Sequence, residues 1–448
     1  MQLWKIFLAA AALSLACGAA HAAPAVKLSK NTFEIVEAVN DDILAQVKTL
    51  MDKVDQGQLG FSLNKITDAD LAKICAAYPK MASITILPSP GVTSLAPLAG
   101  LTGLQSIKLY AGAKVADLTP LAGLTEMQSL DLDGREFATP DLKWMSGMTK
   151  LTRISIKGDD KKRPLTSLEG IPSLPGLKEI WLQSAAPADL TPLVKALPAL
   201  EKITLWWCTI QDLAPLTQLS KLKDLNLYGS KVKDFSPLAG CPQLQTLTYY
   251  ATKESDYSTL GKLTQVRELK GGLTNLNDIS WVASLPSLRK FDVFSELVKD
   301  YAPLGKTGVE HFTIWNMREP ADLSQLSGAV SLTFLRVADT KAGGFAGLAS
   351  LVNLQTLELA KLQDVDLAFL SKLAALTKLN LSECKVSNFE AIAQCAKLET
   401  VDLTKVTGVT SLAALKGLPN LKSITVPKGA FPEPELSGFA VKVRIDQR

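Results

Sequence analysis

Apolar residues recur along most of the chain with a period of about 22 residues. In the unit that begins at Leu225, apolar or small residues occupy positions 0, 2, 7, 10, 13, 16 and 19 counted from that leucine. Position 0 recurs sixteen times, with steps of 21 to 26 residues. The sixteen residues are Ile84, Ile107, Leu130, Ile154, Ile180, Ile203, Leu225, Leu247, Leu269, Phe291, Phe312, Leu335, Leu357, Leu379, Val401 and Ile424. Such a regular repeat predicts a solenoid, in which every unit stacks on its neighbours.

Each unit of the pattern has two parts. The first, of the form x-Leu-x-Leu-x, predicts a short β-strand whose alternate side chains point to opposite faces. The second is a return segment, often Asp-Leu-x-Pro-Leu as in 212–216, and its aspartate suits the first turn of a short helix. We therefore expect an α/β fold, with a curved parallel sheet on the concave side and short helical return segments on the convex side.

The two ends of such a stack need covers, because an end unit has a neighbour on one side only. Asn40 and Thr67 each precede a stretch with apolar residues at helical spacing, which predicts two helices before the first repeat. We expect residues 23–80 to form a helical N-terminal cap and residues 81–427 to form the solenoid. Residues 428–448 are expected to form a C-terminal cap, with a last strand at 439–443.

The repeat pattern resembles the leucine-rich repeats of about 22 residues found in bacterial internalins. The resemblance covers residues 81–427 and implies a leucine-rich-repeat solenoid. Position 5, which is usually asparagine in that family, is here Cys208, Ser230, Thr252 or Cys384, so a continuous asparagine ladder is not expected. Because the motif reflects core packing, we do not carry over the binding of a host receptor.

Residues 1–22 have the composition of an export signal. Lys5 supplies a positive charge, a short apolar stretch follows, and the Ala-His-Ala sequence at 20–22 suits signal peptidase. We therefore expect an exported protein that resides in the periplasm, on the cell surface or outside the cell. Cys17 makes lipidation a less favoured alternative, because Ser14 stands where a bacterial lipobox has leucine.

Composition narrows the possible functions. The chain has 48 basic and 44 acidic side chains, a formal net charge of +4, which gives no general attraction for nucleic acid or anionic membranes. After the signal, no apolar stretch is long enough to span a membrane. The two histidines, His21 and His311, are too few for multi-histidine metal sites and do not favour histidine-assisted nucleophilic catalysis. We expect no cofactor, no metal ion, no nucleic-acid partner and no enzymatic activity.

Five cysteines follow the signal, and four of them occupy inward positions of the repeat. Cys208 and Cys384 share position 5, while Cys241 and Cys395 share position 16. Small apolar residues belong at these positions, so we expect buried free thiols rather than disulfides. No cysteine spacing is typical of a zinc site.

Asp131 and Asp133 point the same way from one predicted strand, as a carboxylate pair for glycoside hydrolysis or calcium binding would. Arg153 and Lys157 lie on the next strand. We therefore interpret the two carboxylates as members of ion pairs. No nucleophile, base or metal-binding group accompanies them.

Aromatic residues concentrate at outward positions of consecutive strands. Position 3 holds Trp206, Tyr228, Tyr250, Phe294 and Trp315, interrupted by Gly272, and Trp181 occupies position 1 one unit earlier. We expect these six residues to form a stripe on the concave face that binds a ligand. The alternative is that the rings only pair with one another across the sheet. Charged or polar residues at flanking outward positions form an expected rim: Lys202, Asp224, Lys270, Asp292, His311 and Arg336.

The sequence thus predicts an exported, non-enzymatic scaffold that recognises a partner protein on its concave face. Two other functions stay open. Flat aromatic rings also stack on sugars, so a glycan or a cell-wall polysaccharide is the first alternative. The second is a structural envelope protein whose stripe serves self-association.

Overall fold

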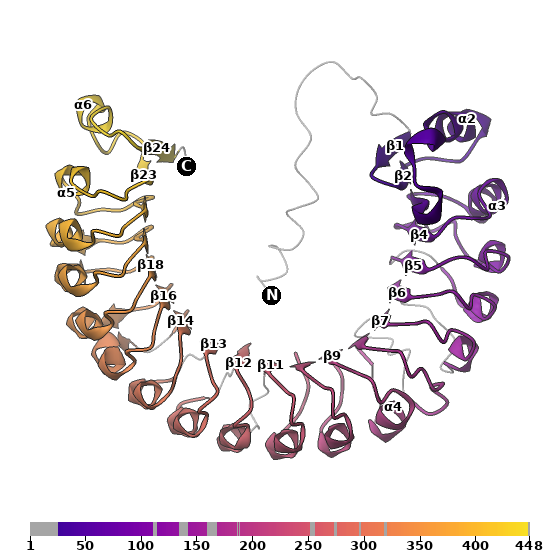
Figure 1. Cartoon of the computed structure of the whole chain (residues 1–448), viewed down its shortest axis with the longest axis horizontal. Coiled ribbons are helices and arrows are strands. Elements are labelled where there is room, and N and C mark those ends of the chain that lie inside the picture. The colour runs from indigo at the N-terminus through magenta and orange to yellow at the C-terminus, as the bar shows by residue number, and fades with distance from the viewer. Residues whose placement is uncertain are drawn as a thin grey trace.

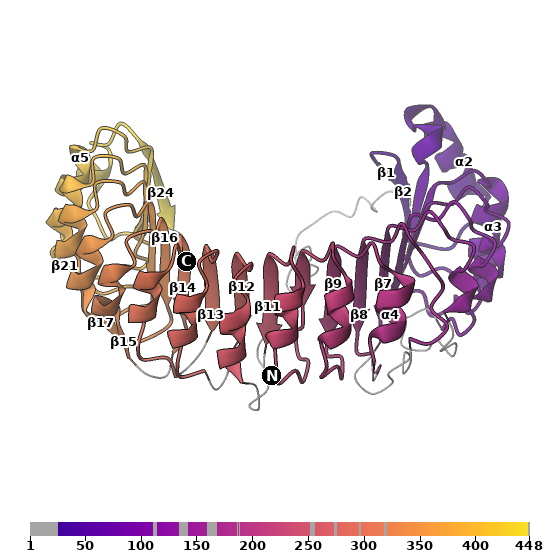
Figure 2. The same ribbon diagram turned by 60° about the horizontal axis from the view of Figure 1, so that its bottom comes forward.

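The protein forms an open horseshoe in which strands line the inner side and short helices the outer side (Figures 1 and 2). The computed structural model describes residues 26–446 except 111–113, 134–141, 159–167, 186, 188, 251–255, 273–275, 295–296 and 318–319, and also leaves out the side chains of 293 and 294. The expected export signal and Cys17 therefore lie outside the described residues. The curved parallel sheet and the helical return segments agree with the fold class predicted from the repeat.

The strands of the solenoid have the predicted register. Each position-0 residue pairs with the next one along the chain, as Leu225 pairs with Ile203 and Leu247, and all sixteen are buried. The strands are β4 (Ser83–Ile86), β5 (Ser106–Leu109), β6 (Ser129–Asp133), β7 (Arg153–Lys157), β8 (Glu179–Gln183), β9 (Lys202–Trp206), β10 (Asp224–Asn226), β11 (Thr246–Tyr250), β12 (Glu268–Gly272), β13 (Lys290–Phe294), β14 (His311–Trp315), β16 (Phe334–Ala338), β18 (Thr356–Ala360), β20 (Lys378–Asn380), β22 (Thr400–Asp402) and β23 (Ser423–Pro427).

The return segments form short helices, mostly of 3-10 type. They are η3 (Ala96–Leu98), η4 (Thr119–Leu121), η5 (Lys143–Met145), α4 (Thr191–Ala196), η6 (Ala214–Gln218), η7 (Ser236–Gly240), η8 (Tyr257–Lys262), η9 (Ser280–Ser284), η10 (Ala302–Lys306), η11 (Leu323–Gly328), η12 (Phe345–Ser350), η13 (Ala368–Lys372), η14 (Phe389–Gln394) and α5 (Ala413–Lys416). In the second half, two pairs of short parallel strands join neighbouring return segments: β15 (Ala321–Asp322) with β17 (Ala342–Gly343), and β19 (Val365–Asp366) with β21 (Val386–Ser387).

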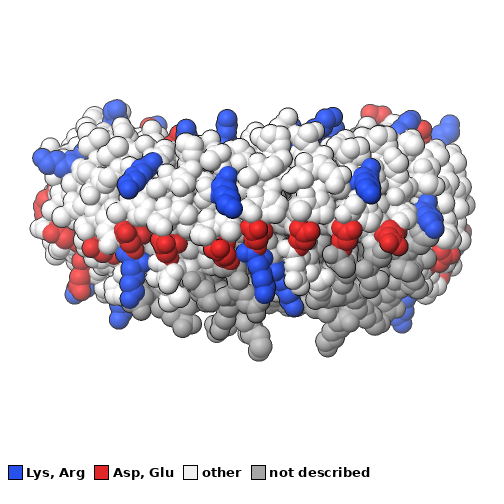
Figure 3. All heavy atoms as spheres, turned by 90° about the horizontal axis from the view of Figure 1, so that it is seen from below, with Lys and Arg blue, Asp and Glu red and all other residues white. Residues whose placement is uncertain are grey.

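The predicted aspartate bonds to the first helical turn are present, with the aspartate as N-cap in η8 and η11 and one residue before the N-cap in the other units. Asp234 accepts the backbone N–H of Ser236 at 2.8 Å, at the start of η7. Equivalent aspartates from Asp189 to Asp322 make the same bond in seven consecutive units. These side chains are exposed, and acidic side chains lie in a row across the convex side (Figure 3). The row is explained by helix capping, because each carboxylate satisfies a backbone donor that the helix leaves unpaired.

A left-handed residue follows the strand at position 4 in many units. Its φ lies between 50° and 71° in the eight members Ser184, Trp207, Gly229, Asn316, Asp339, Lys361, Glu383 and Lys405. The backbone N–H of this residue donates to the position-3 carbonyl of the next unit, as from Trp207 to Tyr228 at 2.7 Å. This bond between units offsets the cost of a left-handed conformation, which is about 1–2 kcal/mol for a residue other than glycine.

The N-terminal segment corrects one expectation. The two predicted helices exist, α2 (Asp41–Leu50) capped by Asn40 and α3 (Asp68–Ala77) capped by Thr67. The same segment also contains β1 (Val26–Ser29), β2 (Thr32–Ile35), η1 (Met51–Lys53), η2 (Gln56–Gln58) and β3 (Gly60–Leu63). Strands β2 and β3 continue the parallel sheet from β4, and β1 pairs antiparallel with β2. A purely helical N-terminal cap is therefore not confirmed.

At the C-terminal end, α6 (Glu433–Leu436) precedes a last strand, β24 (Lys442–Asp446). This strand begins three residues later than the expected 439–443. It pairs parallel with β23 so that Val443 lies opposite Ile424. Ile445 follows at an inward position but is 45% exposed, because no further described unit packs against it.

The five cysteines in the described chain are free and buried, as predicted. The thiols at position 5 donate to a carbonyl of the previous unit, Cys208 to Leu182 at 3.5 Å and Cys384 to Leu359 at 3.3 Å. Burial raises the pKa of Cys384 to about 11. The two cysteines therefore join successive units by hydrogen bonds, and Cys384 stays protonated at neutral pH.

Candidate functional site

Four of the predicted stripe residues form one continuous aromatic cluster on the concave face. Trp181, Trp206, Tyr228 and Tyr250 come from four successive strands or from the residues just after them. Their ring centroids are 5.2 Å apart for the two tryptophans, 5.4 Å for Trp206 and Tyr228, and 4.4 Å for the two tyrosines. Rings at these distances are in direct contact, so the structure brings these four predicted residues together.

Trp207 is a fifth member that the sequence did not predict. It occupies the left-handed position, with φ of 54°, and its ring meets Tyr228 edge-on at 5.4 Å. Its side chain is 48% exposed. Gly229 makes room for it, because a Cβ at that glycine would lie 2.5 Å from Cε3 of Trp207. The signal in the sequence is the Trp-Trp pair, followed 22 residues later by Tyr-Gly.

Exposure differs among the rings of the cluster. Trp207 and Tyr250, which is 39% exposed, both contact Tyr228, and Tyr228 itself is less exposed. Burial, the neighbouring Tyr228 and the charge of Asp292 raise the pKa of Tyr250, so its hydroxyl is a hydrogen-bond donor at neutral pH. Trp207 and Tyr250 are therefore the most accessible rings of the cluster.

An ion pair closes one end of the cluster. Lys157 Nζ lies 4.8 Å from the centre of the Trp181 ring and 3.3 Å from Oδ1 of Asp131. This agrees with the prediction that Asp131 takes part in an ion pair. The lysine covers Trp181 by a cation–π contact, so the accessible part of the cluster begins at Trp206.

One predicted stripe residue, Trp315, is not part of the cluster. Trp315 lies on β14, separated from Tyr250 by β12 and β13, and its indole N–H donates to Asp339 at 3.1 Å. The backbone of Phe294 pairs with Gly272, but its side chain lies outside the description. The rim residue His311 stacks on Phe334 at 5.4 Å.

Charged residues form a second row, where the strands begin. Glu179 pairs with Arg153 and with Lys202, both at 3.5 Å. Nearby rim residues also have partners: Lys270 pairs with Glu268 at 2.7 Å, Asp292 with Lys290 at 3.3 Å and Arg336 with Glu358 at 3.7 Å.

Asp224 is the exception in this row. Within the described part of the chain it has no hydrogen bond and no cation within 4.0 Å. Burial raises the pKa of Asp224, opposed by the charges of Lys202 and Lys270. A half-buried carboxylate without a contact partner is costly, and a cation brought by a ligand would stabilise it.

Short polar side chains form a floor between the two rows. They are Thr204, which is 8% exposed, Asn226 and Thr248, on β9, β10 and β11. Oδ1 of Asn226 accepts the backbone N–H of Tyr228 at 3.1 Å, which leaves its amide NH₂ to face a ligand. The aromatic cluster, these polar side chains and the charged row therefore lie at successive positions along the same strands.

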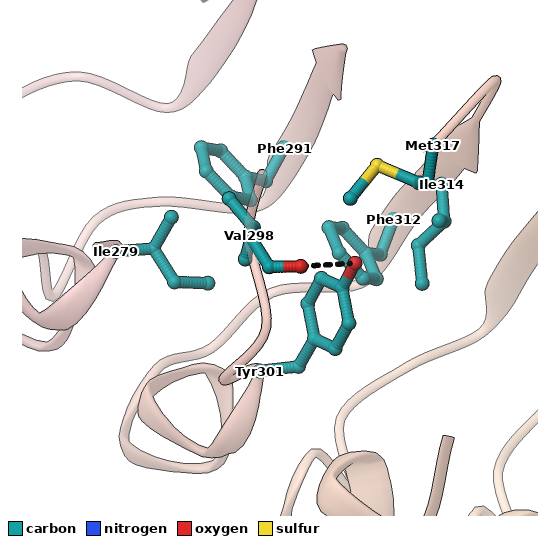
Figure 4. A pocket seen from close by; sticks show the side chains of 7 residues that line it. All are labelled: Ile279, Phe291, Val298, Tyr301, Phe312, Ile314 and Met317. Carbon is teal, nitrogen blue, oxygen red and sulfur yellow. Dashed lines mark hydrogen bonds between the residues drawn. The ribbon is translucent and has the colours of Figure 1, made fainter. Parts of the chain in front are cut away.

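Cavities elsewhere give no comparable site. An apolar cavity next to Tyr301 (Figure 4) has a volume of about 10 Å³, about the size of one water molecule. An open groove of about 440 Å³ runs past Arg289, Glu310 and Gln355, but Arg289 and Glu310 there form an ion pair at 3.5 Å. Among the described residues, no group of three or more His, Cys, Asp or Glu side chains is placed to hold a metal ion.

No helix in the described ranges is sufficiently long and apolar to cross a bilayer.

Neither the known protein-family models nor the curated proteins include a match to this chain. Solved structures do match, with low sequence identity. An internalin from Listeria monocytogenes is 20% identical, with 86% of this chain and 94% of that chain covered and a TM-score of 0.45. A leucine-rich-repeat protein from Leptospira interrogans is 16% identical, with 87% and 93% covered and a TM-score of 0.53.

A third similar structure is TLR13 in a complex with ssRNA13, at 16% identity and a TM-score of 0.55. This comparison covers 87% of the present chain and 56% of the TLR13 chain. The likeness to the Leptospira protein, together with the register of the strands, confirms the fold that the repeat pattern predicted. The chain is therefore a leucine-rich-repeat solenoid.

Proposed function

We propose that this protein is a scaffold that binds a partner protein through the aromatic cluster on its concave face. The observation that carries the proposal is the continuous contact of Trp206, Trp207, Tyr228 and Tyr250 on three successive repeats. Tryptophan and tyrosine are the residues that most often anchor protein interfaces. The stacked repeats hold them in place, so little flexibility is lost on binding.

Packing alone does not explain the cluster. The indole nitrogens of Trp181 and Trp206 are buried and have no hydrogen-bond partner among the described residues. A buried donor that is left unpaired costs about 1–3 kcal/mol. Trp207 adds a left-handed backbone to this cost. Residues selected only for stability would avoid an unpaired buried donor and a left-handed backbone at a tryptophan. These two features therefore support a role in binding.

The ring geometry favours a protein over a glycan. Successive ring planes are tilted by 67° between the two tryptophans, 39° between Trp206 and Tyr228, and 42° between the tyrosines. Rings tilted in this way make ridges and slots rather than a flat platform for successive sugar faces. The charged row alternates in sign, which gives no track for a nucleic-acid backbone.

Export and the absence of catalysis belong to the same proposal. The sequence of residues 1–22 supports export to the periplasm, the cell surface or the exterior. The described polar groups beside the aromatic cluster do not include a nucleophile held by a base, which supports a binding role rather than an enzymatic one.

The test is a capture experiment with matched variants. A triple variant with Trp206, Tyr228 and Tyr250 changed to alanine is expected to lose a partner that the wild-type protein captures from envelope extract. Tyr110→Ala is the control, because Tyr110 occupies the same register position and is 38% exposed but lies outside the cluster. Circular dichroism verifies that both variants fold. Equal capture by the folded triple variant would refute the proposal, while binding on a glycan array that depends on the cluster would favour the glycan alternative.

A further inference from the structure

The strands around the aromatic cluster carry one more acidic than basic side chain on their concave face. Strands β8 to β13 present four acidic and three basic residues at outward positions: Glu179, Asp224, Glu268 and Asp292 against Lys202, Lys270 and Lys290. Each of the three lysines has a carboxylate of its own within 4.0 Å. The carboxylate left over is that of Asp224.

The nearby lysines do not serve Asp224. Lys202 lies opposite it on the preceding strand, but the Nζ atom of Lys202 is 3.5 Å from Oε1 of Glu179. Lys270, two strands further on, is held 2.7 Å from Oε2 of Glu268. Burial raises the pKa of the Asp224 carboxyl in spite of both lysines, so its charged form lacks the solvation or the counter-charge that a carboxylate needs.

We propose that the partner protein carries an arginine or a lysine that pairs with Asp224 while its apolar side chains cover Trp207 and Tyr250. The inference rests on the proposed function and specifies the chemistry of the partner for the same surface. A partner that covers the concave face removes more water from Asp224, and a buried charge without a counter-charge is strongly unfavourable. A partner with an acidic or apolar residue at this point is therefore rejected, which makes Asp224 a determinant of specificity.

Asp224 is placed to contact the same partner as the aromatic cluster. It begins β10, and Tyr228 follows four residues later, which is about 13 Å of extended chain. Asn226 lies between them on the same face, with its Oδ1 held by the backbone N–H of Tyr228 and its amide NH₂ directed to a partner. A protein interface of ordinary size, about 800 Å² on each partner, extends further than this. One partner surface therefore covers the rings and the carboxylate together.

Selection from a library of random short peptides displayed on phage tests this inference on the full-length protein. Peptides that also bind the folded triple variant of Trp206, Tyr228 and Tyr250 are subtracted, so that only peptides dependent on the cluster are counted. We expect arginine and lysine to occur about threefold more often in these peptides than in the unselected library, because a charge pair favours them over neutral residues.

Variants of Asp224 change the sign of the selection. On Asp224→Asn, which keeps the shape of the side chain and removes its charge, the enrichment of basic residues should disappear. On Asp224→Lys, aspartate and glutamate should be enriched instead. Glu358→Gln is the matched control, because Glu358 is a carboxylate of the same face that already has a cation, Arg336, at 3.7 Å. This control should select basic residues as the wild-type protein does.

A second measurement needs no ligand. The fold raises the pKa of Asp224, so it disfavours the ionised form that is present at pH 7, and an uncharged residue there avoids this cost. The midpoint of urea unfolding at pH 7 should therefore be the same or higher for Asp224→Asn than for the wild-type protein. A lower midpoint would show that the carboxylate already has a stabilising partner within the chain, and would overturn the inference.

The inference is also overturned if the library yields no peptide that depends on the cluster, or if such peptides are not enriched in basic residues. Equal enrichment on the wild-type protein and on Asp224→Asn has the same consequence. These failures differ from a failure of the proposed function. A partner whose capture from envelope extract depends on the aromatic cluster, but not on the charge of Asp224, would leave the scaffold function intact and refute only this inference.

Discussion

At the scale of single residues, the most unusual feature is a bulky aromatic residue in a left-handed turn. In the other described units with a left-handed residue at this position, it is serine, glycine, asparagine or a charged residue. Trp207 is accommodated because Gly229, one repeat later, has no side chain where the indole lies. Two residues 22 positions apart therefore act as a pair, and the stacking of repeats is what brings them together.

Gly229→Ala should disturb both the backbone and the Trp207 ring. The glycine has a φ of 71°, and its new Cβ would lie 2.5 Å from the indole. We expect a loss of about 1–2 kcal/mol of stability from the backbone alone, together with a shift in tryptophan fluorescence as the ring leaves Tyr228. Urea unfolding and emission spectra measure the two effects.

Gly429→Ala is the matched control for this change. Gly429 has the same φ of 71° but nothing within 4 Å of a new Cβ. It should lose similar stability with no change in tryptophan emission. If Gly429→Ala shifted the emission as much as Gly229→Ala does, the shift would not report the contact between Gly229 and Trp207.

At the scale of secondary-structure elements, the repeated aspartates set where the helical return segments begin. Asp234→Ala removes the acceptor for the Ser236 N–H and should destabilise the protein by about 1 kcal/mol, the usual cost of a lost cap. Asp234→Asn keeps an oxygen at the same place and should be close to wild type in urea unfolding. Equal loss in both variants would mean that the charge, rather than the hydrogen bond, stabilises the turn.

The elements also show what the sequence could and could not predict. Leucine spacing predicted the sixteen strands of the curved sheet from β4 to β23 and their register, because burial of one face leaves a single register possible. It did not predict the short strands β15, β17, β19 and β21 of the return segments. Strand β2 was missed because Phe33 lies 28 residues before its partner Phe61, outside the period. Strand β3 was missed although Phe61 lies 23 residues before Ile84, because residues 23–80 were assigned to a helical cap. The left-handed turn was missed because a hydrogen bond between units imposes it on residues of unrelated type, and for this reason Trp207 was not recognised.

The same reasoning applies to the candidate site. Periodicity placed Trp206, Tyr228 and Tyr250 on one face, and their contacts follow from the spacing of the strands. It also placed Trp315 in the stripe, yet Trp315 donates to Asp339 three strands away from the cluster. The missing partner of Asp224 was beyond prediction, because the sequence alternates charges along the row without showing which ones pair.

At the scale of the whole molecule, the horseshoe is a stack in which each unit touches its two neighbours. The charged row, the aromatic cluster and the backbone ladder all run along this stack. The curved sheet lies on the inner side of the horseshoe (Figures 1 and 2). The binding that we propose at the middle of the arc would thus depend on units that do not touch the partner, because they hold β9, β10 and β11 in register.

In a stack of this kind, the set of units that a core substitution destabilises should depend on the position of the substituted unit. Leu247→Ala removes a fully buried side chain from the middle, a change that costs about 2–5 kcal/mol, and should lower hydrogen-exchange protection in units on both sides of β11. Ile424→Ala creates a similar cavity near the end, where Ile424 is also fully buried, and should expose mainly β22 to β24. Hydrogen exchange followed by mass spectrometry resolves the two patterns. Loss of protection over the whole chain in both variants would show a single cooperative unit, and loss confined to the altered repeat would show that the units do not support one another.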